Sequence, residues 1–112
     1  MSDEIDFKHF QRVDVRVGTV ISAQLNTKAR KAAYVLKVDF GELGIKTTSA
    51  QITENYEAPD LLGKQIVAII NFPVKLVAGV RSEVLVLAAV SEQNGTVLLQ
   101  PQTAVENGAK VA

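Results

Sequence analysis

Short runs in which apolar and polar residues alternate recur along this chain, and they limit its fold more than any other feature. Two of them, at 13–21 and 34–40, have the period of two that is typical of a strand with one buried face. A third strand is expected at 45–49, after a tight connection at Leu43-Gly44. Gly18 lies inside the first run and predicts a β-bulge or a sharp bend there.

The second half of the chain changes period and then returns to strands. Residues 52–62 have the spacing of a short helix or helical turn, and 66–70 form a β-branched run typical of a strand buried on both sides. A loop is expected over 74–82, and Asn94-Gly95 is a strong signal for a hairpin turn. Further strands are expected at 83–90, 96–100 and 109–111.

The order of these elements predicts the fold. Three strands, a short helix and then two strands is the order of an OB-fold, a five-stranded Greek-key barrel that binds single strands, oligosaccharides and other extended ligands. The sequence therefore predicts an all-β OB-fold with a short helix between strands 3 and 4 and extra elements at both ends of the chain. The length of 112 residues is that of one domain, so we expect a single OB-fold domain over 1–112.

The N-terminal segment is expected to form a short helix through Arg12. Asp6 is placed as its N-cap, and Ile5 and Phe10 have the spacing of a hydrophobic staple. One interpretation is that this helix plugs one end of the barrel as a lid. The alternative is that Phe7 and Phe10 pack across a two-fold axis in a dimer.

Composition excludes several classes of function. Twelve Lys and Arg balance twelve Asp and Glu, so the protein as a whole is not a general binder of polyanions. There is no Cys, which excludes a thiol nucleophile and thiolate metal sites. His9 is the only His and has no nucleophile motif to partner it, and the scattered glycines make no phosphate-binding loop. We therefore expect no enzyme activity, no metal and no cofactor.

Neither catalysis nor membrane insertion is indicated by the acidic pair of the expected helix or by the apolar runs of the chain. Glu54 and Glu57 have the spacing of one face of the short helix, where a solvated surface is expected in place of acid-base chemistry. The start of the chain is charged and lacks the apolar region of a secretory signal. The longest apolar runs, 66–70 and 84–90, are shorter than the roughly 20 residues that span a bilayer. We expect a cytoplasmic protein without membrane insertion.

Small and polar residues gather at the predicted strand ends. Residues 47–51 end the third strand, 71–75 end the fourth, and 76–83 lead into the fifth. Such connections lie near one another on the binding side of an OB-fold, where they would form an apolar groove surrounded by amide, hydroxyl and guanidinium groups. The alternative is that they are turn residues with no further role.

A basic cluster lies in the first long loop, which covers 26–32. It contains Lys28, Arg30 and Lys31. Because the loops between the first two and the last two strands flank the ligand face of many OB-folds, these residues are candidates for one positive rim with Lys75 and Arg81. The alternative is an ordinary solvated loop.

Several long motifs, in the correct order, resemble a known family. The segments VDVRVG at 13–18, LKVDFG at 36–41 and KLVAGVRSEVLVL at 75–87 are similar to the tRNA-binding OB-domain superfamily. Within that superfamily the chain most closely resembles the CsaA-type export chaperones. The motifs that carry this closer resemblance are IKTTSAQIT at 45–53, VAIINFP at 67–73 and AGVRSEVLVL at 78–87.

The chain departs from the tRNA-binding members of this superfamily at three places. They carry Ser-x-Gly-Met before the last barrel strand, where this chain has SEVL at 82–85. They carry Ser-Gly-Leu after the third strand, where this chain has SAQ at 49–51, and their His-Pro loop motif is replaced by NTKAR at 26–30. These regions are associated with RNA contact in the relatives, so their tRNA binding does not simply carry over.

The resemblance implies a homodimer whose interface is built by the chain ends. It also implies an ATP-independent chaperone that holds unfolded or export-bound polypeptides in a hydrophobic pocket. The residues expected to bind the polypeptide are Phe72, Val74 and Val80 for apolar surface, Asn71, Gln51 and Ser82 for the peptide backbone, Lys75 and Arg81 for acidic groups, and Ser49 beside them.

The alternative function is structure-specific tRNA binding on the same face of the fold. There the carboxylate of Glu83 is expected to repel phosphate. The residues expected to contact the nucleic acid are Lys28, Arg30, Lys31, Lys75, Arg81 and Ser82.

Overall fold

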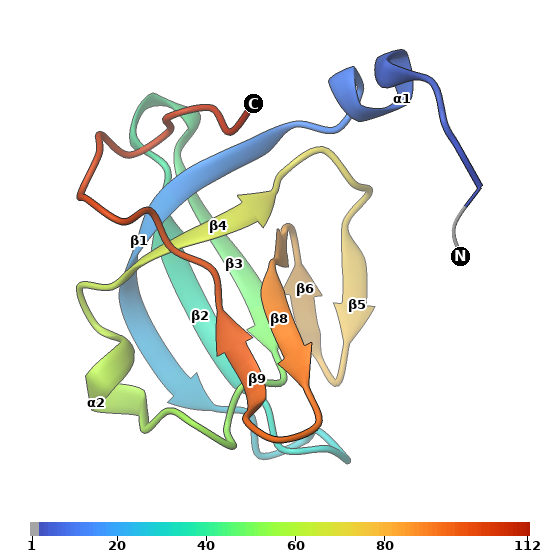
Figure 1. Cartoon of the computed structure of the whole chain (residues 1–112). Coiled ribbons are helices and arrows are strands. Elements are labelled where there is room, and N and C mark those ends of the chain that lie inside the picture. Colours follow the sequence, from blue (N-terminus) through green and yellow to red (C-terminus); the bar gives the residue numbers. More distant parts are fainter. Residues whose placement is uncertain (1–2) are drawn as a thin grey trace.

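The computed structural model describes residues 3–112. Strands make up most of its regular structure (Figure 1). In chain order the elements are α1 (Phe7–Gln11), β1 (Val15–Leu25), β2 (Tyr34–Asp39), the 3-10 helix η1 (Gly41–Leu43), β3 (Ile45–Ala50), α2 (Ala58–Leu61), β4 (Gln65–Ile69), β5 (Lys75–Val77), β6 (Val80–Ser82), β7 (Leu85–Val86), β8 (Ala88–Ser91) and β9 (Gly95–Leu98).

Five strands form the main sheet, in the order β3-β2-β1-β4-β7, and all neighbouring pairs are antiparallel. The sheet curls so that its two outer strands meet. The backbone N–H of Glu83, just before β7, donates to the carbonyl of Thr47 in β3 at 2.8 Å. This nearly closed five-stranded barrel, with α2 between β3 and β4, confirms the predicted OB-fold.

The core fills the inside of this barrel. Leu36, Val38, Phe40 and Ile66 are fully buried, and they come from alternate positions of strands or strand ends. Leu61 of α2 is also fully buried and joins the same cluster, so the short helix closes one end of the barrel. Only Ala58–Leu61 is helical within the expected range 52–62, because Pro59 fits only the first turn of a helix.

The predicted bulge lies three residues further along β1 than expected. The register of β1 against β2 shifts between Val20 and Ser22, so the bulge is not at Gly18, and the sharp bend expected there as the alternative stays a prediction. Gly18 has a packing role instead. A Cβ at this position would lie 2.7 Å from a methyl carbon of Val38 and 2.8 Å from the ring of Phe40. The strand is able to approach the core this closely only because residue 18 has no side chain.

The predicted loop over 74–82 is wrong, because these residues form the hairpin of β5 and β6. Val77 pairs with Val80, and the two turn residues Ala78 and Gly79 have φ of 46° and 82°. Positive φ at both positions defines a type I′ turn, which is usually made by Asn-Gly or Asp-Gly. An Ala in the first position hides the turn from sequence rules, since Ala rarely takes positive φ.

The predicted strand 83–90 is interrupted. Val86 in β7 pairs with Ala68 of β4, whereas Ala88 in β8 pairs with Leu98 of β9, so the chain leaves the main sheet near Leu87. The expected hairpin between 83–90 and 96–100 is present as β8 and β9. Its loop covers 92–94, and Gly95 takes a φ of 72° as the first residue of β9.

The C-terminal segment adds to the barrel on the β1 side (Figure 1, red). Arg16 and Lys110 form an isolated antiparallel bridge, so the strand expected at 109–111 is present only as this bridge. Gly108 packs where a Cβ would lie 2.6 Å from the carbonyl oxygen of Phe40. The segment therefore occupies the place beside β1 that β2 leaves free when it ends.

The N-terminal helix is not a lid. No residue of α1 is buried, Phe7 is 69% exposed, and α1 projects away from the barrel (Figure 1). Asp6 is the N-cap residue as expected, but its side chain makes no capping hydrogen bond. Packing of Phe7 and Phe10 across a two-fold axis stays a prediction. No helix among residues 3–112 has the length and apolar character needed to cross a bilayer.

Replacement of Gly18 by Ala tests the close packing of β1 on the core. We expect Gly18→Ala to lower the free energy of unfolding by about 1–3 kcal/mol, because the new methyl group overlaps Val38 and Phe40. Urea denaturation followed by circular dichroism measures this change. The exposed Gln24→Ala on the same strand serves as the control, with an expected change within about 0.5 kcal/mol. Equal stability of the two variants would contradict this assignment.

Candidate binding groove

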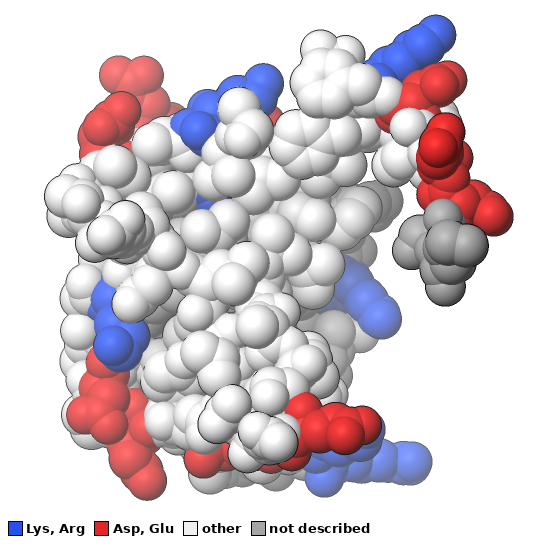
Figure 2. Space-filling view, in the orientation of Figure 1, with Lys and Arg blue, Asp and Glu red and all other residues white. Residues whose placement is uncertain are grey.

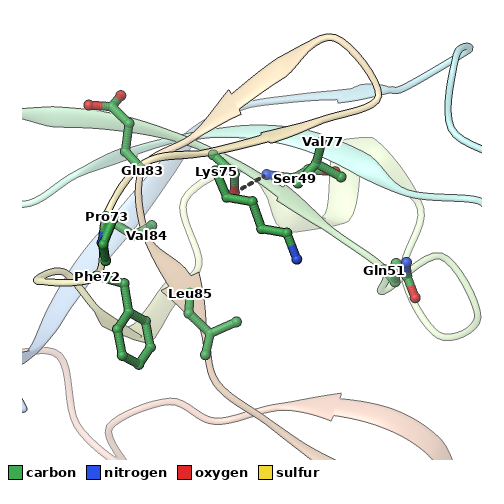
Figure 3. Close-up of a pocket in the computed structure, with 10 residues that line it drawn as sticks. Ser49, Gln51, Phe72, Pro73, Lys75, Val77, Glu83, Val84 and Leu85 are labelled. Atoms are coloured by element: carbon green, nitrogen blue, oxygen red, sulfur yellow. Dashed lines mark hydrogen bonds between the residues drawn. The ribbon is translucent and has the colours of Figure 1, made fainter.

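A hollow of about 470 Å³ opens where β3 meets the segment from β5 to β7. It lies on the seam that closes the barrel, where residues of β3, β5, β6 and β7 and of the connections beside them come together (Figure 3). We call it the seam groove. The residues that line it are Ser49, Gln51, Phe72, Pro73, Lys75, Val77, Ser82, Glu83, Val84 and Leu85.

Side chains make most of the contacts across this seam. The hydroxyl of Ser82 accepts a hydrogen bond from the backbone N–H of Ser49 at 3.2 Å, and the carboxylate of Glu83 accepts one from the N–H of Thr47 at 3.0 Å. These two side chains satisfy N–H groups that a neighbouring strand would otherwise bind. The hydroxyl of Ser82 and one oxygen of Glu83 therefore serve the closure of the barrel.

The hairpin of β5 and β6 forms one wall of the groove. Lys75 and Ser82 are directly paired across the hairpin, and both line the groove. Leu76 and Arg81, paired one position further along, point to the opposite face because side chains alternate along a strand. Leu76 is accordingly 71% exposed. Lys75 and Arg81, which the sequence placed on one rim, therefore lie on opposite faces of the hairpin.

One end of the groove is apolar and the other is polar. Figure 3 shows Phe72 and Leu85 side by side at the apolar end, and their side chains are 50% and 49% exposed. The ammonium group of Lys75 extends toward Gln51 at the polar end, while the carboxylate of Glu83 points away from the hollow. An apolar side chain is therefore able to pack on Phe72 while an acidic or amide group approaches Lys75.

The ammonium group of Lys75 has no carboxylate partner within residues 3–112. The one ion pair in this part of the chain joins Arg16 to Asp14, at 2.6 Å. An unpaired cation next to exposed apolar surface favours a ligand that combines an apolar group with a negative one.

The structure brings together part of the predicted peptide site. Five of its members line the seam groove, namely Ser49, Gln51, Phe72, Lys75 and Ser82. Val74, Val80 and Arg81 lie outside the lining. Pro73, Val77 and Glu83 also line it, and they lie in the segments 71–75 and 76–83 that were expected to form the groove. Val84 and Leu85 were not expected there, because 83–90 was predicted as one strand.

Asn71 has a structural role that the sequence did not indicate. Its side-chain oxygen accepts the backbone N–H of Asp14 at 2.9 Å, and its amide donates to the carbonyl of Arg12 at 2.8 Å. Both ends of the amide are thus occupied in holding the link between α1 and β1. Asn71 lines a separate, smaller hollow beside His9 and Phe72.

The basic loop lies next to the tip of the hairpin. A side chain added at Gly79 would lie 3.5 Å from Cδ of Lys28, and the amide of Asn26 donates to the carbonyl of Ala78 at 3.5 Å. The loop that carries Lys28, Arg30 and Lys31 is therefore a neighbour of the β5–β6 turn. The Lys28 side chain is the part of this loop that lies beside Gly79 at the turn.

The proteins that this chain resembles are tRNA-binding domains and CsaA chaperones. The model of the family described as "Putative tRNA binding domain" matches residues 15–110. The crystal structure of chaperone CsaA from Bacillus anthracis str. Ames is 50% identical, with a TM-score of 0.93, and covers 98% of this chain and 100% of that one. The CsaA chaperone protein from Picrophilus torridus is 43% identical, with a TM-score of 0.92, over 97% of this chain and 100% of that one.

The curated relatives are much longer proteins. The methionine–tRNA ligase of Methanococcoides burtonii is 35% identical over 106 residues, which is 95% of this chain and 15% of the ligase. The chain therefore spans a small fraction of the length of the curated relatives that it matches.

Proposed function

The chain belongs to the putative tRNA-binding domain family, and within it we propose that the protein is a CsaA-like chaperone that binds segments of unfolded or precursor polypeptides in the seam groove. The single observation that carries the proposal is the apolar end of that groove, where Phe72 and Leu85 are each about half exposed. Exposed apolar surface inside a hollow marks a binding site for another apolar group.

Each part of the seam groove has a role in this proposal. An apolar side chain of the client packs on Phe72 and Leu85, and burial of one such side chain contributes about 1.5–3 kcal/mol. The amide of Gln51 pairs with the client backbone, and Lys75 attracts an acidic side chain or a chain carboxylate. Binding of this kind is non-catalytic and needs no nucleotide. One domain over 1–112 and a cytoplasmic location belong to the same proposal.

Replacement of Phe72 tests the groove directly. Removal of this ring takes away the main apolar anchor, so we expect Phe72→Ala to weaken the binding of fluorescein-labelled peptides from unfolded preproteins about tenfold. Fluorescence anisotropy measures the affinity. Leu62→Ala is the matched control, because Leu62 is 53% exposed and lies outside the groove. If the wild-type protein shows no saturable binding at high micromolar concentration, the proposed function is wrong. If both variants lose the same affinity, the groove is not the binding site.

We also propose that the protein is a homodimer, as the resemblance implied. Figure 2 shows a broad face whose middle is uncharged and whose Lys, Arg, Asp and Glu lie along the edges. It covers β8, β9 and the C-terminal segment (Figures 1 and 2). Because Leu98 is buried, Val97 and Leu99 on either side of it point outward, and they are 38% and 43% exposed. An uncharged face that exposes valine and leucine side chains is typical of a subunit interface.

A charged residue on this face tests the dimer. We expect the wild-type protein to sediment as a dimer and Leu99→Asp to sediment as a monomer, because a buried unpaired carboxylate opposes association. Analytical ultracentrifugation gives the mass. Leu62→Asp places the same charge at an exposed leucine outside the face and is expected to remain dimeric. A monomeric wild-type protein would contradict the proposal.

The second candidate function is tRNA binding, and the position of Lys28 favours it. The basic loop adjoins the β5–β6 turn, so a phosphate backbone that crosses the hairpin tip meets Lys28 and its neighbours. The carboxylate of Glu83 is turned away from the hollow and bonds to the N–H of Thr47, and its negative charge at the seam opposes the extension of such a surface toward Lys75. The favourable surface is therefore limited to the loop and the hairpin tip.

Salt dependence distinguishes this candidate. If tRNA binds through the loop, Lys28→Glu is expected to reduce the slope of log affinity against log salt by at least about one, because the substitution removes at least one phosphate contact. Gel shifts with total tRNA at several salt concentrations measure it. Lys8→Glu on α1 carries the same charge change away from the loop and should leave the slope unchanged. No salt-sensitive shift with wild-type protein would exclude tRNA binding.

A further inference from the structure

A second hollow, of about 280 Å³, adjoins the seam groove at Phe72. It is lined by His9, Arg12, Val13, Asn71 and Phe72. Phe72 is the one residue that lines both hollows. A ligand that packs on this ring in the seam groove is therefore next to the second hollow as well.

Hydrogen bonds to backbone groups hold the residues around the second hollow in place. The amide of Asn71 bonds both to the carbonyl of Arg12 at 2.8 Å and to the N–H of Asp14 at 2.9 Å, and the N–H of Ile70 donates to the carbonyl of Asp14 at 2.9 Å. These bonds attach the end of α1 to the connection between β4 and β5. The backbone of Arg12 is thus fixed next to Asn71 and Phe72, even though α1 buries none of its residues.

The second hollow carries positive charge. Arg12 has no carboxylate partner within residues 3–112, since the nearby carboxylate of Asp14 is paired with Arg16 at 2.6 Å. Among the described residues 3–112, no acidic one lines the hollow. The acidic residues of this region, Asp3, Glu4 and Asp6, precede α1, whereas Arg12 follows it. Two unpaired cations, Lys75 and Arg12, therefore stand in the two hollows that share Phe72.

We propose that the second hollow is a subsite for an acidic side chain of the polypeptide bound in the seam groove. This inference rests on the proposed peptide-binding function and names the class of segment bound. An apolar residue packs on Phe72, and an Asp or Glu a short distance along the same segment pairs with Arg12. Charge complementarity selects such segments, and a partly exposed ion pair of this kind changes affinity up to about fivefold.

Arg12 is exposed, and Asn71 holds it through its backbone carbonyl. Because Asn71 bonds to the backbone of Arg12, the Arg12 side chain can be replaced without loss of this attachment. Substitution at Arg12 therefore probes binding and leaves the fold in place.

A peptide series with one apolar anchor tests the subsite. The probes are labelled peptides of Gly and Ser with a single Leu, and with Asp or Lys placed at successive positions on each side of it. We expect wild-type protein to prefer Asp over Lys by about fivefold at positions close to the Leu on one side. Arg12→Glu should reverse this preference at the same positions. Lys8→Glu, on the same helix but outside the hollow, should keep it.

The outcomes separate this inference from the function on which it rests. No binding of any Leu peptide would contradict the proposed function. Binding that depends on Phe72 but shows the same preference in Arg12→Glu as in wild type would overturn the subsite and leave the function intact. Loss of tRNA binding in Arg12→Glu, with peptide preference unchanged, would assign the second hollow to nucleic acid and also overturn the subsite.

Discussion

The hydrogen bonds of Thr48 hold the barrel closed, and the binding groove depends on them. Thr48 is 1% exposed, and its hydroxyl donates to the carbonyl of Val84 at 2.7 Å. Since a hydroxyl has one hydrogen, the Ser82 hydroxyl donates to Thr48 at 2.9 Å and keeps its lone pairs for the N–H of Ser49. A buried polar group left unpaired costs about 1–3 kcal/mol, so this small network fixes the two sides of the seam relative to each other.

This closure explains the position and character of the groove. Short side chains, in place of a full strand ladder, join β3 to the segment before β7, and the hollow opens beside them. The hairpin of β5 and β6 then directs alternate residues into it, which places Lys75 inside and Arg81 outside. The apolar part comes from Phe72 and Leu85, which the ends of the barrel strands hold in place. The groove is a consequence of how the barrel closes.

The barrel was predictable from the sequence because its strands have a clear period of two, and the strand-end segments 47–51, 71–75 and 76–83 were expected to form a groove. The hairpin was not, since Ala78 takes the positive φ that sequence rules reserve for Gly, Asn or Asp. That one residue hid which of Lys75 and Arg81 faces the groove. The helix α1 was predicted correctly, but five residues give too little pattern to show whether it packs on the barrel. The role of Asn71 depends on contacts with residues 12 and 14, which no local pattern encodes.

The central claim is that the seam groove is where the protein holds polypeptides. Backbone amide chemical shifts, followed by NMR during titration with an acidic, Leu-containing peptide, test it most directly. The account predicts that the largest changes fall on Ser49, Gln51, Phe72, Lys75 and Leu85, while the amides of the basic loop at 28–31 change little. Changes confined to that loop, or spread evenly over the barrel, would contradict it.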